Sequence, residues 1–388
     1  MTSKYQVTTF QLDAALATAE KIRLLTECAD KQFIDRAELT AVTQIALVAG
    51  EHLLLLAKPG TAKTSYVDYI AEGLGVQSFY ASLNAETASD DLYGPINPMT
   101  IHTHWERVKA GIMTSPIVFL DEVGKAPAEV QHLLIPTMQE RKLPVLDDRI
   151  DLPLHCLFGA TNETITDNPA FFDRFALRCH LTYIKDVNLF LTMLTSIVDE
   201  PPTQYQCTLD ELANMRRVCS ALATKPSQGA LRTMGELFTS HPIKFANEEP
   251  ISDRRWKRTL PCAAAHALLR GETEINAVNL SVARFMYWSD HEQSKAVADW
   301  VLERTDKEIG IYREKLALVV EAEKMYAQVA NNATEKEKLE LSYNVRKIVS
   351  AIRKYKSNQW DDLRNRAQNL VDQLETVEDV FEKEDLAF

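Results

Sequence analysis

The feature that most constrains the fold is an apolar run that leads directly into a loop containing glycine. Residues 53–57 read Leu-Leu-Leu-Leu-Ala, as in a buried parallel strand, and residues 58–64 read Lys-Pro-Gly-Thr-Ala-Lys-Thr. A strand, such a loop and a following helix are typical of the phosphate-binding pattern G-x-x-x-x-G-K-[ST]. In this pattern the loop N–H groups hold phosphate oxygens, the lysine reaches the β and γ phosphates, and the hydroxyl binds Mg²⁺. Gly60, Lys63 and Thr64 match it.

A second apolar run ends in two acidic residues. Residues 117–120 read Ile-Val-Phe-Leu and are followed by Asp121 and Glu122. Ligands of open α/β sheets bind at the carboxyl ends of the strands, so we expect both carboxylates to lie beside the Lys63 loop, where Mg²⁺ needs them. The alternative is that the acidic pair only caps the next helix.

Further along, a third strand at 157–161 delivers Asn162 to the same edge. Five segments in this order resemble the MoxR family of AAA+ ATPases, and within it the RavA-like group. They are Pro59-Gly60-Thr61-Ala62-Lys63-Thr64, Phe119-Leu120-Asp121-Glu122-Val123, Ala160-Thr161-Asn162-Glu163, Phe172-Asp173-Arg174-Phe175 and Ser252-Asp253-Arg254-Arg255-Trp256. The resemblance extends over about residues 30 to 290.

The resemblance implies an α/β P-loop AAA+ core, a parallel sheet flanked by helices, followed by an all-α lid. A helical C-terminal extension follows, which has no counterpart in a minimal ATPase module. We expect these parts at residues 1–187, 188–296 and 297–388. A length of 388 residues agrees with more than one domain. In the extension, apolar residues recur at helical spacing, which predicts two or three helices that pack together or form an intermolecular coiled coil, with an acidic tail after them.

By resemblance, each site residue receives a role toward ATP and Mg²⁺. Lys63 binds the β and γ phosphates, Thr64 and Asp121 hold Mg²⁺, and Glu122 polarises the attacking water. Asn162 matches the sensor that orients this water. The remaining loop residues that contact ATP are Lys58, Pro59, Gly60, Thr61 and Ala62.

Four arginines are candidates for contact with the nucleotide. The resemblance places an arginine finger, which acts on the ATP of a neighbouring subunit, at Arg174, with Arg178 as the second choice. A step of four residues would place these two on one helix face. Arg254, with Arg255 as the alternative, matches a sensor in the lid that contacts the nucleotide of its own subunit. One sequence does not separate the members of each pair.

Two alanines replace the glycines of the phosphate-binding pattern. Ala62 agrees with the Thr-Ala-Lys-Thr form of the resembled family. Ala57 is the departure, because a Cβ there would restrict positive φ and crowd the loop. We therefore expect the site to be present, with its affinity and turnover affected by Ala57.

Two stretches within the core predict inserts. Residues 94–115 are polar, with His102, His104 and Trp105, where the family carries a hairpin. Residues 141–153 alternate and turn at Asp147-Asp148, which predicts a second hairpin. Either insert is a surface for partner contact or a plain surface loop.

Charge and cysteine use narrow the class of partner and compartment. The net charge of −12 argues against nucleic acid as the main partner. Six cysteines without metal-ligand spacing predict a reduced, cytoplasmic protein, and no apolar run is long enough to span a bilayer. The resemblance implies a homo-hexameric ring that remodels a partner protein, with a von Willebrand factor A domain as the family's frequent companion. The alternatives are a nucleotide-gated scaffold with slow turnover and a nucleic-acid motor.

Overall fold

The computed structural model describes residues 7–99, 106–145, 148–162, 168–245, 250–306, 315, 318–320, 322–326, 335–352 and 364–372. The chain forms two compact units, Met1–Val301 and Leu302–Phe388. Within the described ranges, no helix is long and apolar enough to cross a membrane.

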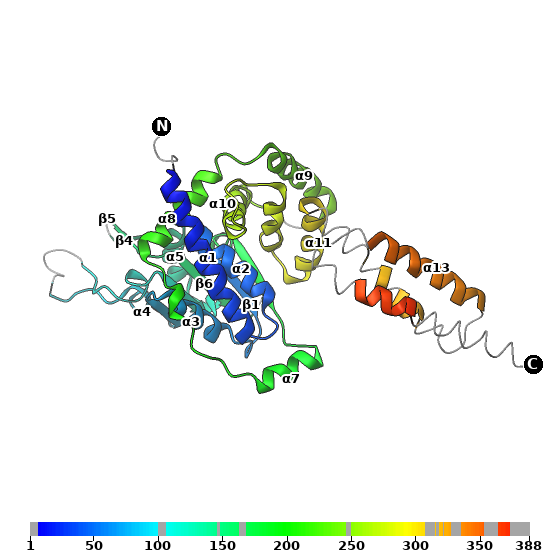
Figure 1. Ribbon diagram of the computed structural model, residues 1–388. Coiled ribbons are helices and arrows are strands. Elements are labelled where there is room, and N and C mark those ends of the chain that lie inside the picture. The colour runs from blue at the N-terminus through cyan, green and yellow to red at the C-terminus, as the bar shows by residue number, and fades with distance from the viewer. Residues whose placement is uncertain are drawn as a thin grey trace, which may run out of the picture. The chain divides into compact units, whose positions relative to one another are not determined.

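A sheet of five parallel strands forms the centre of the first unit (Figure 1). Its order is β2-β3-β6-β1-β7, so β1 lies between two strands that come much later in the chain. Central parallel strands are covered on both faces, and β1 and β6 are accordingly buried along their whole length. The five strands are β1 Leu53–Ala57, β2 Ser78–Ser82, β3 Ile117–Asp121, β6 Cys156–Thr161 and β7 Leu177–Leu181.

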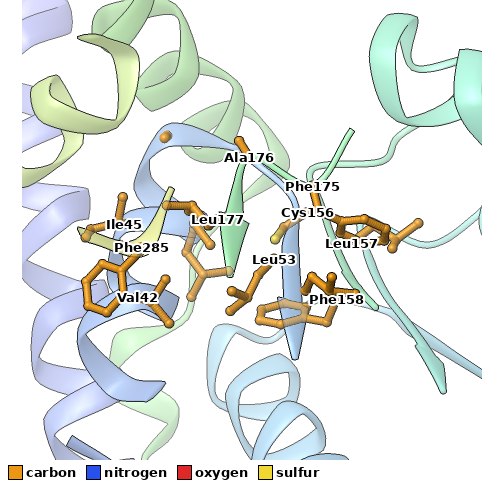
Figure 2. Close-up of a cluster of buried hydrophobic side chains, with 14 of the residues drawn as sticks. Val42, Ile45, Leu53, Cys156, Leu157, Phe158, Phe175, Ala176, Leu177 and Phe285 are labelled. Atoms are coloured by element: carbon orange, nitrogen blue, oxygen red, sulfur yellow. The ribbon is translucent and has the colours of Figure 1, made fainter. Parts of the chain in front are cut away.

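The core of this unit is built around β1, the strand between β6 and β7. Leu53 pairs with Phe158 of β6 on one side and with Leu177 of β7 on the other. Figure 2 shows side chains from these strands packed together, with Val42 and Phe285 from the covering elements beside them. This arrangement, with the helical regions described next, confirms the predicted AAA+ fold.

Helices precede and alternate with the strands, as predicted. Thr8 and Gln11 form a capping box that starts the first helix, and Gly50 and Gly75, both in the left-handed conformation, end the second and third. The helices before β7 are α1 Thr9–Gln32, α2 Ala37–Ala49, α3 Lys63–Leu74, α4 Ser89–Tyr93, η2 Gly111–Met113, η3 Val123–Lys125, α5 Ala128–Glu140 and α6 Pro169–Phe172.

After β7 the described part of the first unit is helical. Helix α10 packs against α2 and α8, which joins this helical region to the core. The elements are α7 Val187–Thr195, η4 Thr203–Tyr205, α8 Leu209–Leu222, α9 Gln228–Lys244, α10 Asp253–Leu269, η5 Ala277–Phe285, η6 His291–Gln293 and α11 Ser294–Thr305.

The structure describes the two predicted inserts in part. The hairpin near Asp147 is confirmed, since β4 (Lys142–Val145) pairs antiparallel with β5 (Asp148–Asp151). In the other insert, Ile96 and Arg107 form an antiparallel bridge. Asp147 and residues 100–105, with His102, His104 and Trp105, lie outside the described residues.

The second unit has its own small core around α13, Glu335–Ile352. Leu341, Val345 and Ile352 are buried on one face of α13, which agrees with the predicted helical spacing. The Arg366 guanidinium forms an ion pair with Glu323, 2.7 Å between Nη2 and Oε2. Residues 327–334 and 353–363, and the predicted acidic tail, lie outside the described residues.

Candidate nucleotide site

Three neighbouring strands bring the predicted site residues together at their carboxyl ends. Lys63 begins α3 after the loop that follows β1, and its Nζ lies 3.4 Å from Asn162 Oδ1, after β6. The same Nζ lies 3.5 Å from Asp121 Oδ1, at the end of β3. Because β6 lies between β3 and β1, residues far apart in the sequence converge at this edge.

The Asn162 amide connects the lysine to the predicted catalytic carboxylate. Its Oδ1 faces the Lys63 ammonium, and its Nδ2 donates a hydrogen bond of 2.5 Å to Glu122 Oε1. An amide that accepts from a cation and donates to a carboxylate is oriented by both charges. Glu122 Oε2 lies 3.4 Å from Lys125 Nζ, so both carboxylate oxygens have a partner.

The loop before α3 has the conformation and the open donors that a phosphate group needs. Gly60 and Ala62 have φ of 75° and 63°, and no side chain caps the first turn of α3. The N–H groups of that turn are therefore open to an anion, which the helix dipole also favours. Lys63 is 7% exposed at the foot of this loop, and its Nζ also donates to the Ala57 carbonyl oxygen at 3.3 Å. These residues fit a triphosphate.

The expectation that the Cβ of Ala57 restricts a positive φ and crowds the loop is wrong. Ala57 is the last residue of β1, pairs with Leu181 and is not among the residues of positive φ. Its Cβ belongs to the core, where Ala57 is 4% exposed. Besides Gly60, the loop residue in the left-handed conformation is Ala62, where an L side chain is strained. Of the two alanines, only Ala62 therefore places strain on the backbone.

The two acidic residues do not act as a helix cap. Glu122, with φ of 55°, precedes the short helix η3, but its side chain makes no capping hydrogen bond. Its N–H instead donates to Asp121 Oδ1 at 3.0 Å. Asp121 and the half-buried Thr64 are the oxygen donors available to Mg²⁺ beside Lys63. Among the described residues, no three His, Cys, Asp or Glu side chains gather as a metal site, so phosphate and water oxygens would complete the shell.

Sequence reasoning missed one residue at the loop. Tyr183 Oη donates to the Pro59 carbonyl oxygen at 3.0 Å, and Lys58 Nζ lies 5.8 Å from the centre of the Tyr183 ring. Thr61 Oγ1 donates to the Lys58 carbonyl oxygen at 2.9 Å and is the loop's internal support. Tyr183 follows β7, and its role becomes visible only when β7 is known to neighbour β1.

The expectation that Arg174 and Arg178 share a helix face is wrong. Arg174 lies in the turn after α6 and donates to the Ala170 carbonyl oxygen at 2.8 Å. Arg178 lies within β7, is 3% exposed and donates to the carbonyl oxygens of Trp288 and Phe172. A guanidinium buried in its own subunit in this way supports the fold at that position.

Arg254 and Arg255, at the start of α10, pair with Asp173. Arg254 Nη1 lies 2.9 Å from Asp173 Oδ2, Arg255 Nη2 lies 3.3 Å from Oδ1, and Ser252 Oγ donates to Oδ1 at 2.7 Å. The Ser252 hydroxyl also caps α10 by accepting from Arg255 N.

Asp173 precedes β7 and so lies near the amino-terminal end of that strand. Lys63, Asp121 and Asn162 instead lie at the carboxyl ends of their strands. One turn further along α10, Arg258 pairs with Glu51, just before β1. The structure therefore brings Arg254 and Arg255 to the amino-terminal side of the sheet with Asp173. Their contact with the nucleotide of their own subunit stays a prediction.

The pKa of Arg174 shows that Arg174, Arg254 and Arg258 lie close together. Partial burial, followed by the positive charge of Arg254, lowers the pKa of Arg174, and Arg258 acts in the same direction. These guanidinium groups are thus close enough to repel one another, while Asp173 and Glu51 compensate part of their charge. Such a cluster of positive charge favours the binding of an anion at this edge.

Comparison with known families agrees with this geometry. Residues 20–216 match a model described as the MoxR domain in the MoxR-vWA-beta-propeller ternary systems. Residues 236–301 match a model described as an AAA lid domain. The first match covers the phosphate loop and the Asp121, Asn162 and Arg174 segments, and the second covers α10.

The chain is also similar to other proteins and to a solved structure. Two uncharacterized proteins of Methanocaldococcus jannaschii are each 28% identical, over 293 residues (74% of this chain and 74% of the relative) and 280 residues (71% and 72%). A solved structure from Cytophaga hutchinsonii, provisionally described as an ATPase, superposes with a TM-score of 0.59 at 19% identity. It covers 76% of this chain and 97% of its own, a likeness that concerns the fold alone. Because the MoxR model matches just over half of its residues, the chain belongs to the MoxR family of AAA+ ATPases.

Proposed function

We propose that this protein is a Mg²⁺-dependent ATP hydrolase whose catalytic carboxylate is Glu122. The observation that carries the proposal is the Asn162 amide, which joins the Lys63 ammonium to the Glu122 carboxylate at one sheet edge. Phosphoryl transfer requires positioning and charge stabilisation, and a lysine, a carboxylate and an orienting amide within hydrogen-bond reach supply both.

Each side chain has one task in this proposal. The loop N–H groups and Lys63 bind the phosphates, and Glu122 orients the attacking water by accepting its hydrogen bond. Asn162 holds Glu122 in place and senses the γ-phosphate. Thr64 and Asp121 would hold Mg²⁺, which neutralises phosphate charge and orients the β and γ oxygens.

The arginines of the Asp173 edge complete the site from a neighbouring subunit. Arg174 and Arg254 approach each other beside Asp173, on the side where the chain enters the sheet. An anion of the same subunit held by Lys63 would lie at the opposite ends of the strands. We therefore assign Arg174 to the neighbour's ATP, and we assign Arg254 to it as well, in place of the untested contact that the sequence predicts for Arg254 within its own subunit. Arg178, which is buried in β7, is not part of this assignment.

The wider role is a proposal that membership of the family supports. We propose a ring, with six subunits as the expected number, that uses ATP hydrolysis to remodel or help mature a partner protein in the cytoplasm. The description of the matching family model supports a partner with a von Willebrand factor A domain. Placement in the RavA-like group stays a prediction.

Two substitutions test the hydrolase. Glu122→Gln should abolish steady-state ATP hydrolysis and keep or tighten ATP binding, because the amide cannot accept the water's proton but adds no charge beside the phosphates. Lys63→Ala should weaken ATP binding itself. Glu129→Gln, which changes an exposed carboxylate in the first turn of α5, is the matched control and should behave as wild type.

The same assays separate the alternatives. Wild-type turnover in Glu122→Gln would remove Glu122 from its role. Tight ATP binding with negligible wild-type turnover would indicate a scaffold, and stimulation of hydrolysis by DNA or RNA that weakens with salt would indicate a nucleic-acid motor.

A further inference from the structure

Helix α7 and residues 196–198 form an apolar surface that no other described part of the chain buries. No charged residue occurs from 187 to 198, and no residue of α7 is buried. Figure 1 shows α7, in green, set apart from the sheet and its covering helices. The exposed apolar side chains, with exposed fractions from 39% to 81%, are Val187, Leu189, Phe190, Leu191, Met193, Leu194, Ile197 and Val198.

Asn188, Thr192 and Thr195 recur at helical spacing and lie on one face of α7, while the apolar side chains cover the rest of the helix. Contiguous exposed apolar surface of this kind marks an interaction site. Eight partly exposed side chains amount to several hundred Å², a large share of the roughly 800 Å² that each partner contributes to a standard interface. The α7 surface is thus large enough to contribute substantially to a specific contact.

A matching hollow lies on the helical part of the first unit. Phe238, His241, Pro242, Phe245, Ile251 and Trp256 line a groove of about 360 Å³ at α9 and the start of α10. Phe238 is 57% exposed and packs edge-on against Trp256, with 5.4 Å between the ring centres. Burial lowers the pKa of His241, so the lining carries no charge at neutral pH. The groove is therefore suited to an apolar helix.

The two surfaces flank the two halves of the proposed catalytic site. Tyr183, which bonds to Pro59 of the phosphate loop, lies four residues before α7. On the other side, Ile251 and Trp256 of the groove directly flank the segment from Ser252 to Arg255. Contact between the surfaces of two subunits would bring the arginines of one subunit toward the phosphate loop of the other.

We propose that α7 of one subunit docks in the Phe238–Trp256 groove of the next subunit, an inference that rests on the proposed function. The contact joins two different surfaces of the same chain, so it is heterologous and generates a ring when the rotation closes. Two copies of a chain with net charge −12 repel each other, and a contact between uncharged surfaces adds no further like charges at the interface. Both surfaces are present in every copy.

Aspartate substitutions on each surface test the contact. Leu194→Asp and Phe238→Asp should each raise the protein concentration needed for half-assembly by at least about tenfold, because a carboxylate would be buried in an apolar contact. Sedimentation with and without Mg²⁺-ATP measures this. Thermal unfolding of the Leu194→Asp monomer should match wild type, since Leu194 is 61% exposed. Phe10→Asp, at an equally apolar and exposed position on α1, is the control and should assemble normally.

Cross-linking identifies which surfaces meet. Leu194→Cys and Phe238→Cys are introduced into separate chains in a Cys28→Ser background, since Cys28 is the one native cysteine that is not buried. Mixing the two chains with a bismaleimide should give covalent dimers that neither chain forms alone. In the double variant, an internal cross-link within the monomer would overturn the proposal, because α7 would then occupy its own groove.

The outcomes also separate this inference from the proposed function. Wild-type protein that binds no ATP would remove the proposed function. Wild-type protein that binds and hydrolyses ATP, together with Leu194→Asp and Phe238→Asp variants that assemble normally, would remove only the docking contact. Restored assembly when Leu194→Asp is combined with Phe238→Lys would support the contact directly, since opposite charges would then meet.

Discussion

At the residue scale, the two alanines of the phosphate loop have different backbone constraints. Ala57 is an extended, buried strand residue, whereas Ala62 has a φ of 63°. Ala57→Gly should lower the free energy of unfolding by about 1 kcal/mol and leave ATP affinity unchanged, because glycine weakens a strand interior. Ala62→Gly should change the free energy of unfolding by about 0 to +1 kcal/mol. The reason is that relief of backbone strain in the folded state offsets the flexibility gained by the unfolded chain.

Denaturant unfolding and ATP titration of both variants check this pair. Each variant is the control for the other, since the chemical change is the same and only the backbone conformation differs. A marked gain in ATP affinity for Ala57→Gly would mean that its Cβ does crowd the phosphates, contrary to the structure.

The sequence predicted the site residues that follow strands better than it predicted the arginines. Lys63, Asp121 and Asn162 lie together because the carboxyl ends of parallel strands share one edge, a rule that needs only the strands. Arg178 was misplaced because the segment 177–181 carries Arg and His and was not recognised as β7. The Tyr183 contact was missed for the same reason.

At the element scale, α10 is attached to the core by paired charges. Asp173 is 15% exposed and Arg255 8% exposed in their ion pair, so loss of the carboxylate would leave a mostly buried guanidinium without this partner. Asp173→Asn should therefore lower the free energy of unfolding by about 3 kcal/mol. Denaturant unfolding measures it.

The matched control lies at the other end of the same helix. Arg270 and Glu272 form an ion pair in which Arg270 is 49% exposed, and Glu272→Gln should cost less than about 1 kcal/mol. Equal losses in Asp173→Asn and Glu272→Gln would show that the Asp173 pair does not anchor α10.

At the scale of the whole molecule, the proposed shared site requires complementation between subunits. Arg174→Ala and Lys63→Ala should each be inactive alone and should recover part of the hydrolysis when mixed. In mixed assemblies an intact Lys63 loop meets an intact Arg174 from the neighbour. Steady-state hydrolysis across mixing ratios measures this.

The control is a mixture of Glu122→Gln and Lys63→Ala. Both defects lie in the same half of the site, so no neighbour can repair them. Lack of recovery at every ratio of Arg174→Ala to Lys63→Ala, in assemblies shown to exchange subunits, would exclude Arg174 as a trans-acting residue.

Buried histidines make the stability of the whole fold sensitive to acid. Burial lowers the pKa of His155 to about 4, and nearby Arg141 reinforces the effect. The unfolded state then binds a proton below pH 6.5, whereas the folded state binds it only near pH 4. Stability is therefore full above pH 6.5 and falls as the pH drops through this window, by about 3 kcal/mol for His155 alone.

Urea unfolding between pH 7.5 and 4.5 measures this loss. His155→Gln, which keeps an N–H donor for the Leu47 carbonyl, should reduce the pH dependence. His132→Gln changes an exposed histidine and is the control. An unchanged pH dependence in His155→Gln would show that this histidine is not the source.

The sequence by itself determined the chemistry-bearing segments and the fold class, because apolar periodicity, the glycine loop and strand-end polar residues are local properties. The tertiary structure decided which residues meet. Only the strand order places Asn162 between Lys63 and Glu122, pairs Arg254 with Asp173, and buries Arg178. It also leaves every residue of α7 unburied by the part of the chain that the structure describes. These relations join residues far apart in the chain, and such contacts depend on how all the elements pack rather than on any local pattern.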